Sequence, residues 1–142
     1  MRSILKYNWI FFLFLIFSCN SERTDEISSL KDEVIGIHDE VMPLMGELKS
    51  LKKEIEVKSK DLYEEDSTLN QGKIEELNLM AAELQSAFDG MFVWMRQYKS
   101  PEEDMDREEA KIYLMEQKQK VELVNKDIKT ALASAKQELG KD

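Results

Sequence analysis

One histidine and four methionines are the side chains whose types and spacing best suit metal chemistry. His38, Met42 and Met45 follow one another at helical spacing, and Met91 and Met95 lie one helical turn apart further along the chain. Imidazole and thioether groups are borderline and soft ligands that suit Cu(I). Folding the chain back near residues 65 and 100 would gather all five side chains toward one end of the protein. A copper or small-ligand site is therefore one interpretation.

The same side chains also suit the interior of a helical protein, and the sequence favours this second interpretation. Methionine fills irregular gaps in cores and packs well against aromatic rings such as Phe88, Phe92 and Trp94. His38 would then be a partly buried imidazole paired with a carboxylate, for instance that of Asp39 or Asp89. We accordingly predict neither a metal site nor a cofactor, and we keep the histidine–methionine cluster as the alternative.

Little material for catalysis remains elsewhere in the sequence. The chain has one histidine, one cysteine and five glycines, so it lacks the residues for a nucleophilic triad or a glycine-rich phosphate loop. Its many Asp and Glu residues are what the solvated faces of long helices require. The sequence therefore predicts a protein that is not an enzyme.

The N-terminus combines a basic start (MRSILK), an apolar run over residues 10–17 and a lone cysteine. The run is too short to span a bilayer, since a spanning helix needs roughly 20 apolar residues. The segment LIFSC at residues 15–19 resembles the lipobox of bacterial lipoproteins, in which the chain is cleaved before a cysteine that becomes lipidated. The resemblance implies a signal peptide over residues 1–18, lipidation of Cys19, and a lipidated cysteine with its tether over residues 19–25.

Net charge limits the partners of the processed chain. The whole chain has a formal charge of -9, and removing residues 1–18 takes away two of its 20 basic residues and none of its 29 acidic ones, which leaves -11. An acidic surface repels phosphate, so nucleic acid is excluded as a partner. It also gives no attraction to anionic lipid, so membrane attachment must come from the acyl chains on Cys19.

These observations predict a location in the cell envelope, with the body in the periplasm or at the cell surface. Asn20 follows the cysteine where Asp would favour retention in the inner membrane. The outer membrane is therefore slightly favoured.

Long amphipathic helices are the pattern of the remaining chain, residues 26–142. Apolar residues recur at gaps of three and four, which predicts helices over about 26–63, 68–98 and 101–139. Pro43 should bend the first of them, because proline lacks the N–H that would bond to the carbonyl four residues earlier.

The ends of the third helix are marked by capping residues. Ser100 fits as its N-cap, Pro101 fits in its first turn, and Glu103 would complete a capping box. Gly140 fits as its stop. Within this helix, Gln117 lies in a polar patch over residues 116–120 that interrupts the apolar stripe, so we expect thinner packing there.

Two short connections between three helices predict an all-α fold, an antiparallel three-helix bundle or coiled coil behind the leader. Such a bundle is elongated and lacks the large concave pocket that most enzymes use. The first functional hypothesis is a membrane-anchored envelope lipoprotein with a helical interaction or scaffolding domain. The alternative is a His/Met-based copper or small-ligand binding protein of the envelope. Self-association is a third hypothesis, because the polar patch leaves room for another chain.

Three segments of the chain resemble a group of small lipoproteins from Bacteroidetes-type bacteria. These are HDEVMPLMG at residues 38–46, Trp94-Met95 with Tyr98, and the run over residues 113–120. Members of the group are often labelled "viral A-type inclusion protein", a label that reflects coiled-coil-like similarity. The resemblance implies a lipidated envelope protein and carries no activity or catalytic residues with it.

Overall fold

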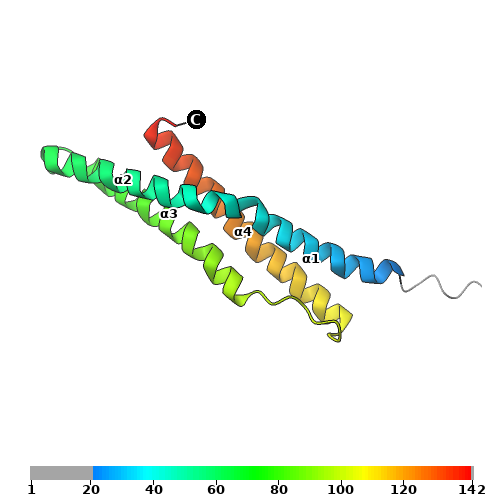
Figure 1. Ribbon diagram of the computed structural model, residues 1–142. Helices are drawn as coiled ribbons and strands as arrows, with labels where there is room; N and C mark the ends of the chain where they lie inside the picture. The colour runs from blue at the N-terminus through cyan, green and yellow to red at the C-terminus, as the bar shows by residue number, and fades with distance from the viewer. Residues whose placement is uncertain (1–20, 142) are drawn as a thin grey trace, which may run out of the picture.

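Five helical segments follow one another along the chain in a computed structural model, which describes residues 21–141 and the side chains from residue 26 onward. They are α1 (Ser21–Val41), the 3₁₀ segment η1 (Met42–Leu44), α2 (Met45–Asp66), α3 (Gln71–Gln97) and α4 (Arg107–Leu139). The first three form one bent rod, which we call the first rod (Figure 1). The protein is an all-α helical bundle, as predicted.

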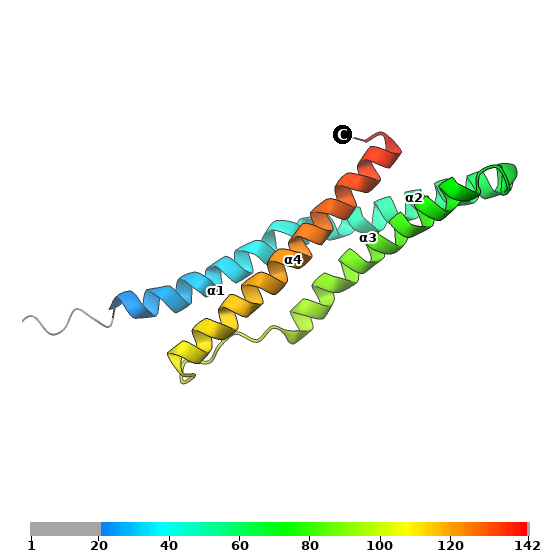
Figure 2. The same cartoon turned by 180° about the vertical axis from the view of Figure 1, so that it is seen from behind.

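The two halves of the first rod pack against different partners. α2 packs mainly against α3, whereas α1 packs mainly against α4. Figures 1 and 2 show the consequence: the α2–α3 hairpin extends toward one end of the molecule, and the α1–α4 pair extends toward the other. The α3–α4 contact joins the two pairs along the middle.

The core of the first rod follows a repeat of seven residues. Val34, Val41, Leu48 and Ile55 are each at most 1% exposed. A strict seven-residue repeat keeps one side of a helix turned toward its neighbours, as in a left-handed coiled coil. On the facing helices the same role falls to Leu77, Leu84, Met91, Leu114, Val121 and Ile128, all fully or almost fully buried.

The predicted bend at Pro43 is confirmed. α1 ends at Val41, and Met42–Leu44 form a single 3₁₀ turn before α2 begins at Met45. Proline removes one hydrogen bond from the α-helical ladder, and the tighter 3₁₀ turn accommodates the interruption. The bend is the point at which the first rod passes from α4 to α3.

The predicted start of the third helix at residue 101 was wrong. Tyr98 is extended (ψ 129°), and α4 begins only at Arg107. Asp106 is the actual N-cap, because its carboxylate accepts hydrogen bonds from the backbone N–H groups of Glu108 and Glu109 at 3.0 and 3.2 Å. The capping pattern at Ser100 is therefore not used, and residues 98–106 form the connection to α4.

The other helix boundaries agree more closely with the sequence. α1 begins at Ser21, five residues before the predicted start, so residues 21–25 of the predicted tether are helical. The second helix spans 71–97 where 68–98 was expected. Gly140 ends α4 as predicted, with the left-handed φ of 64° that glycine adopts without strain.

Gln117 does not interrupt the core as expected. It is 5% exposed, like its apolar neighbours on the same face of α4, although its Oε1 has no hydrogen-bond partner among the described residues. The other helices cover that face of α4, so the Gln117 side chain is buried although it is polar. The expectation of thinner packing at Gln117 was therefore wrong.

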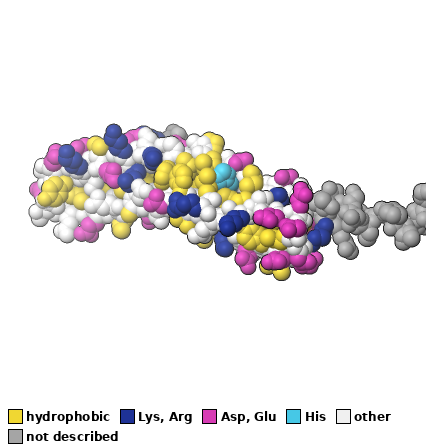
Figure 3. All heavy atoms as spheres, turned by 60° about the horizontal axis from the view of Figure 1, so that its bottom comes forward, with side chains coloured by type: hydrophobic (Ala, Val, Ile, Leu, Met, Phe, Trp, Pro, Cys, Tyr) yellow, Lys and Arg dark blue, Asp and Glu magenta, His cyan; other side chains and the backbone are white. Residues whose placement is uncertain are grey.

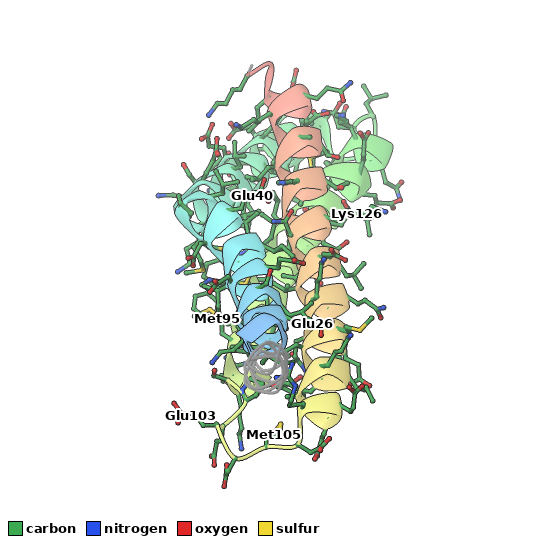
Figure 4. All side chains as sticks on the ribbon, turned by 90° about the vertical axis from the view of Figure 1, so that its right-hand side faces the viewer. Glu26, Glu40, Met95, Glu103, Met105 and Lys126 are labelled. Carbon is green, nitrogen blue, oxygen red and sulfur yellow. The ribbon has the colours of Figure 1, made fainter. Side chains whose placement is uncertain are left out.

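A row of glutamates joins the first rod to α4. The glutamates recur every seven residues, and the ion pairs are Glu26–Lys111, Glu33–Lys118 at 2.6 Å, Glu40–Lys129 at 2.6 Å, Glu47–Lys136 at 2.8 Å and Glu54–Lys141. Each lysine lies 85–89 residues after its glutamate, a near-constant offset that requires the first rod and α4 to run parallel. Figure 4 shows Glu26 and Glu40 in the seam between α1 and α4.

Glu40 holds two successive turns of α4. Its second oxygen accepts a hydrogen bond from the Asn125 amide at 2.9 Å, and that amide also donates to the carbonyl of Ile37 at 3.0 Å. The hydrogen bond from Lys129 is the largest cause that lowers the pKa of Glu40, followed by that from Asn125. The pKa of Glu26 is lowered in the same way by Lys111.

Glu138 connects the end of α4 to both α2 and α3. Its carboxylate binds Lys58 of α2 at 2.8 Å and Lys73 of α3 at 2.7 Å, and its side chain is only 13% exposed. Lys58 also donates to the backbone carbonyl of Glu138 at 3.0 Å. The two lysine ammonium groups, first that of Lys58, lower the pKa of the carboxyl.

These carboxylates make the fold sensitive to acid. A carboxyl whose pKa is lower in the folded than in the unfolded chain stabilises the fold above its unfolded pKa, near 4.5, and loses this contribution as the pH falls through the folded value. We therefore expect the free energy of unfolding to be nearly constant from about pH 7 to 5.5 and to decrease below about pH 4.5. Urea denaturation at a series of pH values measures it.

Glu138→Gln separates the contribution of this site from the rest. At pH 7 the variant should unfold more easily by about 1 kcal/mol, because Lys58 and Lys73 lose a charged acceptor. The difference from the unaltered chain should shrink below about pH 4.5, where the carboxyl becomes protonated. A difference that stays constant down to pH 3 would contradict the assignment.

Candidate functional site at the proline bend

His38 lies on α1 one turn before the bend, at the edge of the core. Its side chain is 16% exposed, and its Nδ1 is 2.8 Å from Oδ1 of Asp39. The imidazole packs against the indole of Trp94 on α3, with ring centroids 5.6 Å apart. The expected partly buried imidazole paired with Asp39 is thus confirmed, and its aromatic neighbour is Trp94.

Trp94 continues this contact as a row of rings toward the loop. Its ring stacks on Tyr98 at 5.0 Å, and Tyr98 stacks on Tyr113 of α4 at 6.4 Å. Burial raises the pKa of Tyr98. The Tyr113 hydroxyl accepts a hydrogen bond from the Lys99 N–H at 2.8 Å, so the row fixes the point where the chain leaves α3. Its members hold the end of α3 against α1 and α4.

Two more rings continue along α3 beside the bend. Phe88 and Phe92 lie 4.9 Å apart, and the Lys49 ammonium sits 4.6 Å above the Phe88 ring. A cation at this distance from an aromatic face is attracted by the ring quadrupole. In Figure 3 the histidine lies beside an apolar area near the middle of the molecule. We call the surface formed by His38, Met42, Phe88, Phe92 and Met95 the bend surface.

The four methionines of the proposed cluster differ in exposure. Met91 is fully buried and Met45 is 6% exposed, and both belong to the core. Met42 packs against that core from its margin, and Met95 is 38% exposed. The fold therefore brings His38, Met42 and Met95 to the surface region and encloses the other two sulfurs. Met105 lies in the loop before α4, away from Met95 (Figure 4).

A copper site would need more than this arrangement provides without movement. Only the histidine, Met42 and Met95 are accessible to an ion from solvent, and Met45 and Met91 would have to leave the core. Among the side chains that the structure describes, no three His, Cys, Asp or Glu residues meet as ligands of a metal ion. Cys19, the predicted lipidation site, lies outside the described residues.

Sequence reasoning missed two parts of this region. The stack of Trp94, Tyr98 and Tyr113 joins residues of two helices, and their spacing carries no signal that they meet. The glutamates of the first rod were a readable signal, because five of them recur at intervals of seven. Such a series flanking an apolar stripe indicates a parallel charged neighbour, here α4.

Open grooves run along the seams between helices. One of about 640 Å³ lies beside the loop before α4 and is lined by Ile27, Pro101, Met105 and charged residues. Another of about 560 Å³ follows α2 past the end of α4 and is lined by Val57, Leu62, Leu139 and charged residues. Within residues 21–141, no helix has an apolar stretch long enough to cross a membrane.

Comparison of the chain with models of protein families, with curated proteins and with solved structures finds no match. The interpretation of the bend surface therefore rests on its own geometry and chemistry.

If the methionines serve packing, their effects on stability should follow burial. Met91→Ala should lower the free energy of unfolding by about 2–5 kcal/mol, because it leaves a cavity in the core. Met95→Ala, at a site 38% exposed, should lower it by less than about 1 kcal/mol. Urea denaturation of both variants measures the contrast, and equal losses would show that packing is not what distinguishes them.

Proposed function

We propose that this chain is a lipid-anchored protein of the bacterial cell envelope whose helical bundle is an interaction or scaffolding module, without enzymatic activity. The observation that carries the proposal is the combination of a lipobox-like leader with an ordered bundle that keeps apolar side chains on its outside. Besides the bend surface, Val93 is 41% and Ile112 60% exposed. These exposed apolar side chains are available to a partner.

Several features support the anchoring part of the proposal. The predicted leader ends at residue 18, directly before Cys19, and α1 begins at Ser21. The chain has no other cysteine, and its acidic body has no electrostatic affinity for anionic lipid. Two or more acyl chains on one cysteine give a stable attachment at about 0.8 kcal/mol per buried methylene. Asn20 after the cysteine favours the outer membrane.

Lipidation of Cys19 is tested by expressing the full chain in a bacterium and measuring the mass of the mature protein. We expect residues 1–18 to be absent, Cys19 to carry acyl chains, and the protein to sediment with membranes. In Cys19→Ala, the leader should stay attached and no acyl chain should be added. The control Asn20→Ser should be processed normally. An intact leader with an unmodified thiol would refute the anchor.

A copper-handling function is the second candidate, because the Asp39 carboxylate holds one nitrogen of His38 in the manner in which carboxylates orient metal-binding histidines. A Cu(I) titration of residues 20–142, compared with His38→Ala and Met95→Ala, decides between the two. We expect no stoichiometric binding. Binding at a ratio of one to one that disappears in His38→Ala would replace the scaffold proposal with metal binding.

A further inference from the structure

α4 has a second apolar face that no part of the described chain covers. Ile112 is 60%, Met115 48% and Leu123 59% exposed. At about 100° per residue these three and Gln119 lie within about 40° of a common direction on the helix. We call them the outer stripe. Lys126 shares this direction one turn beyond Leu123, so it closes the stripe at that end, and Figure 4 shows it on the side of α4 turned away from α1.

Charged residues flank the outer stripe in a regular arrangement. On the same helical geometry, Glu109, Glu116, Lys120 and Asp127 lie along one flank, and Lys111, Lys118, Glu122 and Lys129 lie along the other. Each residue of the first flank has the opposite charge to the residue two positions later on the second flank. The three lysines of the second flank already bind the first rod but remain 35–48% exposed, and an ammonium group has three hydrogen-bond donors.

This arrangement is complementary to a parallel copy of itself. When two parallel helices meet through the same face about a two-fold axis, the first flank of each lies beside the second flank of the other. Glu109 then meets Lys111 of the second copy, and Glu116 meets Lys118, while Lys120 and Asp127 meet Glu122 and Lys129. In an antiparallel pair centred on the stripe, Glu116 would meet Lys120 and Glu108 would meet Lys126. Glu109 would however face Asp127, and the two Lys118 residues would face each other, so fewer opposite charges meet than in the parallel pair.

We propose that the outer stripe is the contact between two copies of this chain that lie side by side and parallel, with Ile112, Met115 and Leu123 in the seam. The proposal rests on the anchoring proposed above, because anchors in one membrane impose the parallel orientation that the charges favour. The stripe extends over roughly 17 Å of α4, so it buries far less than the roughly 1,200–2,000 Å² of stable complexes. Pairing therefore needs the high local concentration that a shared membrane provides.

The test uses residues 20–142 with an N-terminal hexahistidine in place of the lipid, bound to phosphatidylcholine vesicles that contain a nickel-chelating lipid. The buried core lies entirely between Val34 and Ala135, so this chain retains all of it. Gln119→Cys and Ile112→Cys each introduce a single thiol for a short bis-maleimide cross-linker. Leu79→Cys, 67% exposed on α3, is the matched control outside the stripe.

On vesicles we expect Gln119→Cys and Ile112→Cys each to cross-link to a second copy, about tenfold more than in solution at equal total concentration. Adding Leu123→Asp or Met115→Asp should reduce the cross-linked fraction about tenfold, because a carboxylate would be buried in the seam. Adding Glu116→Lys should also reduce it, by placing like charges beside Lys118. Circular dichroism should show unchanged helix in all of them, since the altered side chains are exposed.

Three results would overturn the proposal. One is equal cross-linking of Leu79→Cys, which would indicate crowding alone. Another is an undiminished yield with both Leu123→Asp and Met115→Asp. The third is cross-linking of Gln119→Cys without that of Ile112→Cys, which would indicate an antiparallel pair. Since the tag replaces the lipid, these results leave the lipidation of Cys19 untouched, and the mass measurement above leaves the pairing untouched.

Discussion

The seven-residue repeat of the first rod is the constraint on which the other features depend. Val34, Val41, Leu48 and Ile55 give that rod one continuous apolar side, which no isolated helix can remove from water. Two other helices must therefore cover it, and both connections of the chain serve this requirement. The glutamates one position before this repeat lie at the border of the covered side, where they select the neighbouring helix by charge. Burial thus supplies the stability, the two short connections make α4 run parallel to the first rod, and the ion pairs fix the register between them.

Pro43 divides this constraint between two partners. Before the bend the apolar side is covered chiefly by α4, and after it chiefly by α3. Glu40, just before the bend, binds both Asn125 and Lys129, which lie one turn apart on α4. The carboxylate therefore spans the place where the pairing between the rods shifts. The aromatic row starts at His38 near this place and leads to Tyr113 near the start of α4.

The sequence was a good guide wherever a single local signal decided the outcome. The apolar spacing predicted three rods, Pro43 predicted the bend, and Gly140 predicted the end of α4. The start of α4 was mispredicted because Ser100 and Asp106 offer similar capping signals, each worth about 1 kcal/mol, and the sequence alone does not show which of them the chain uses. Contacts such as His38 with Trp94 depend on how rods slide past one another, which spacing alone does not determine.

The early start of α1 limits how a chain attached at Cys19 can move. Only Asn20 would separate the attachment point from the first helical residue, Ser21, and the first rod then continues for roughly 70 Å to Asp66. With so short a link, an anchored bundle would pivot about the attachment point as one rigid body. The turn at residues 67–70, where Leu69 is 83% exposed, would then reach points up to roughly 70 Å from the attachment point. The loop before α4 would stay near the lipid surface. Helix length would then set the height of the tip, and each added turn would raise it by about 5 Å.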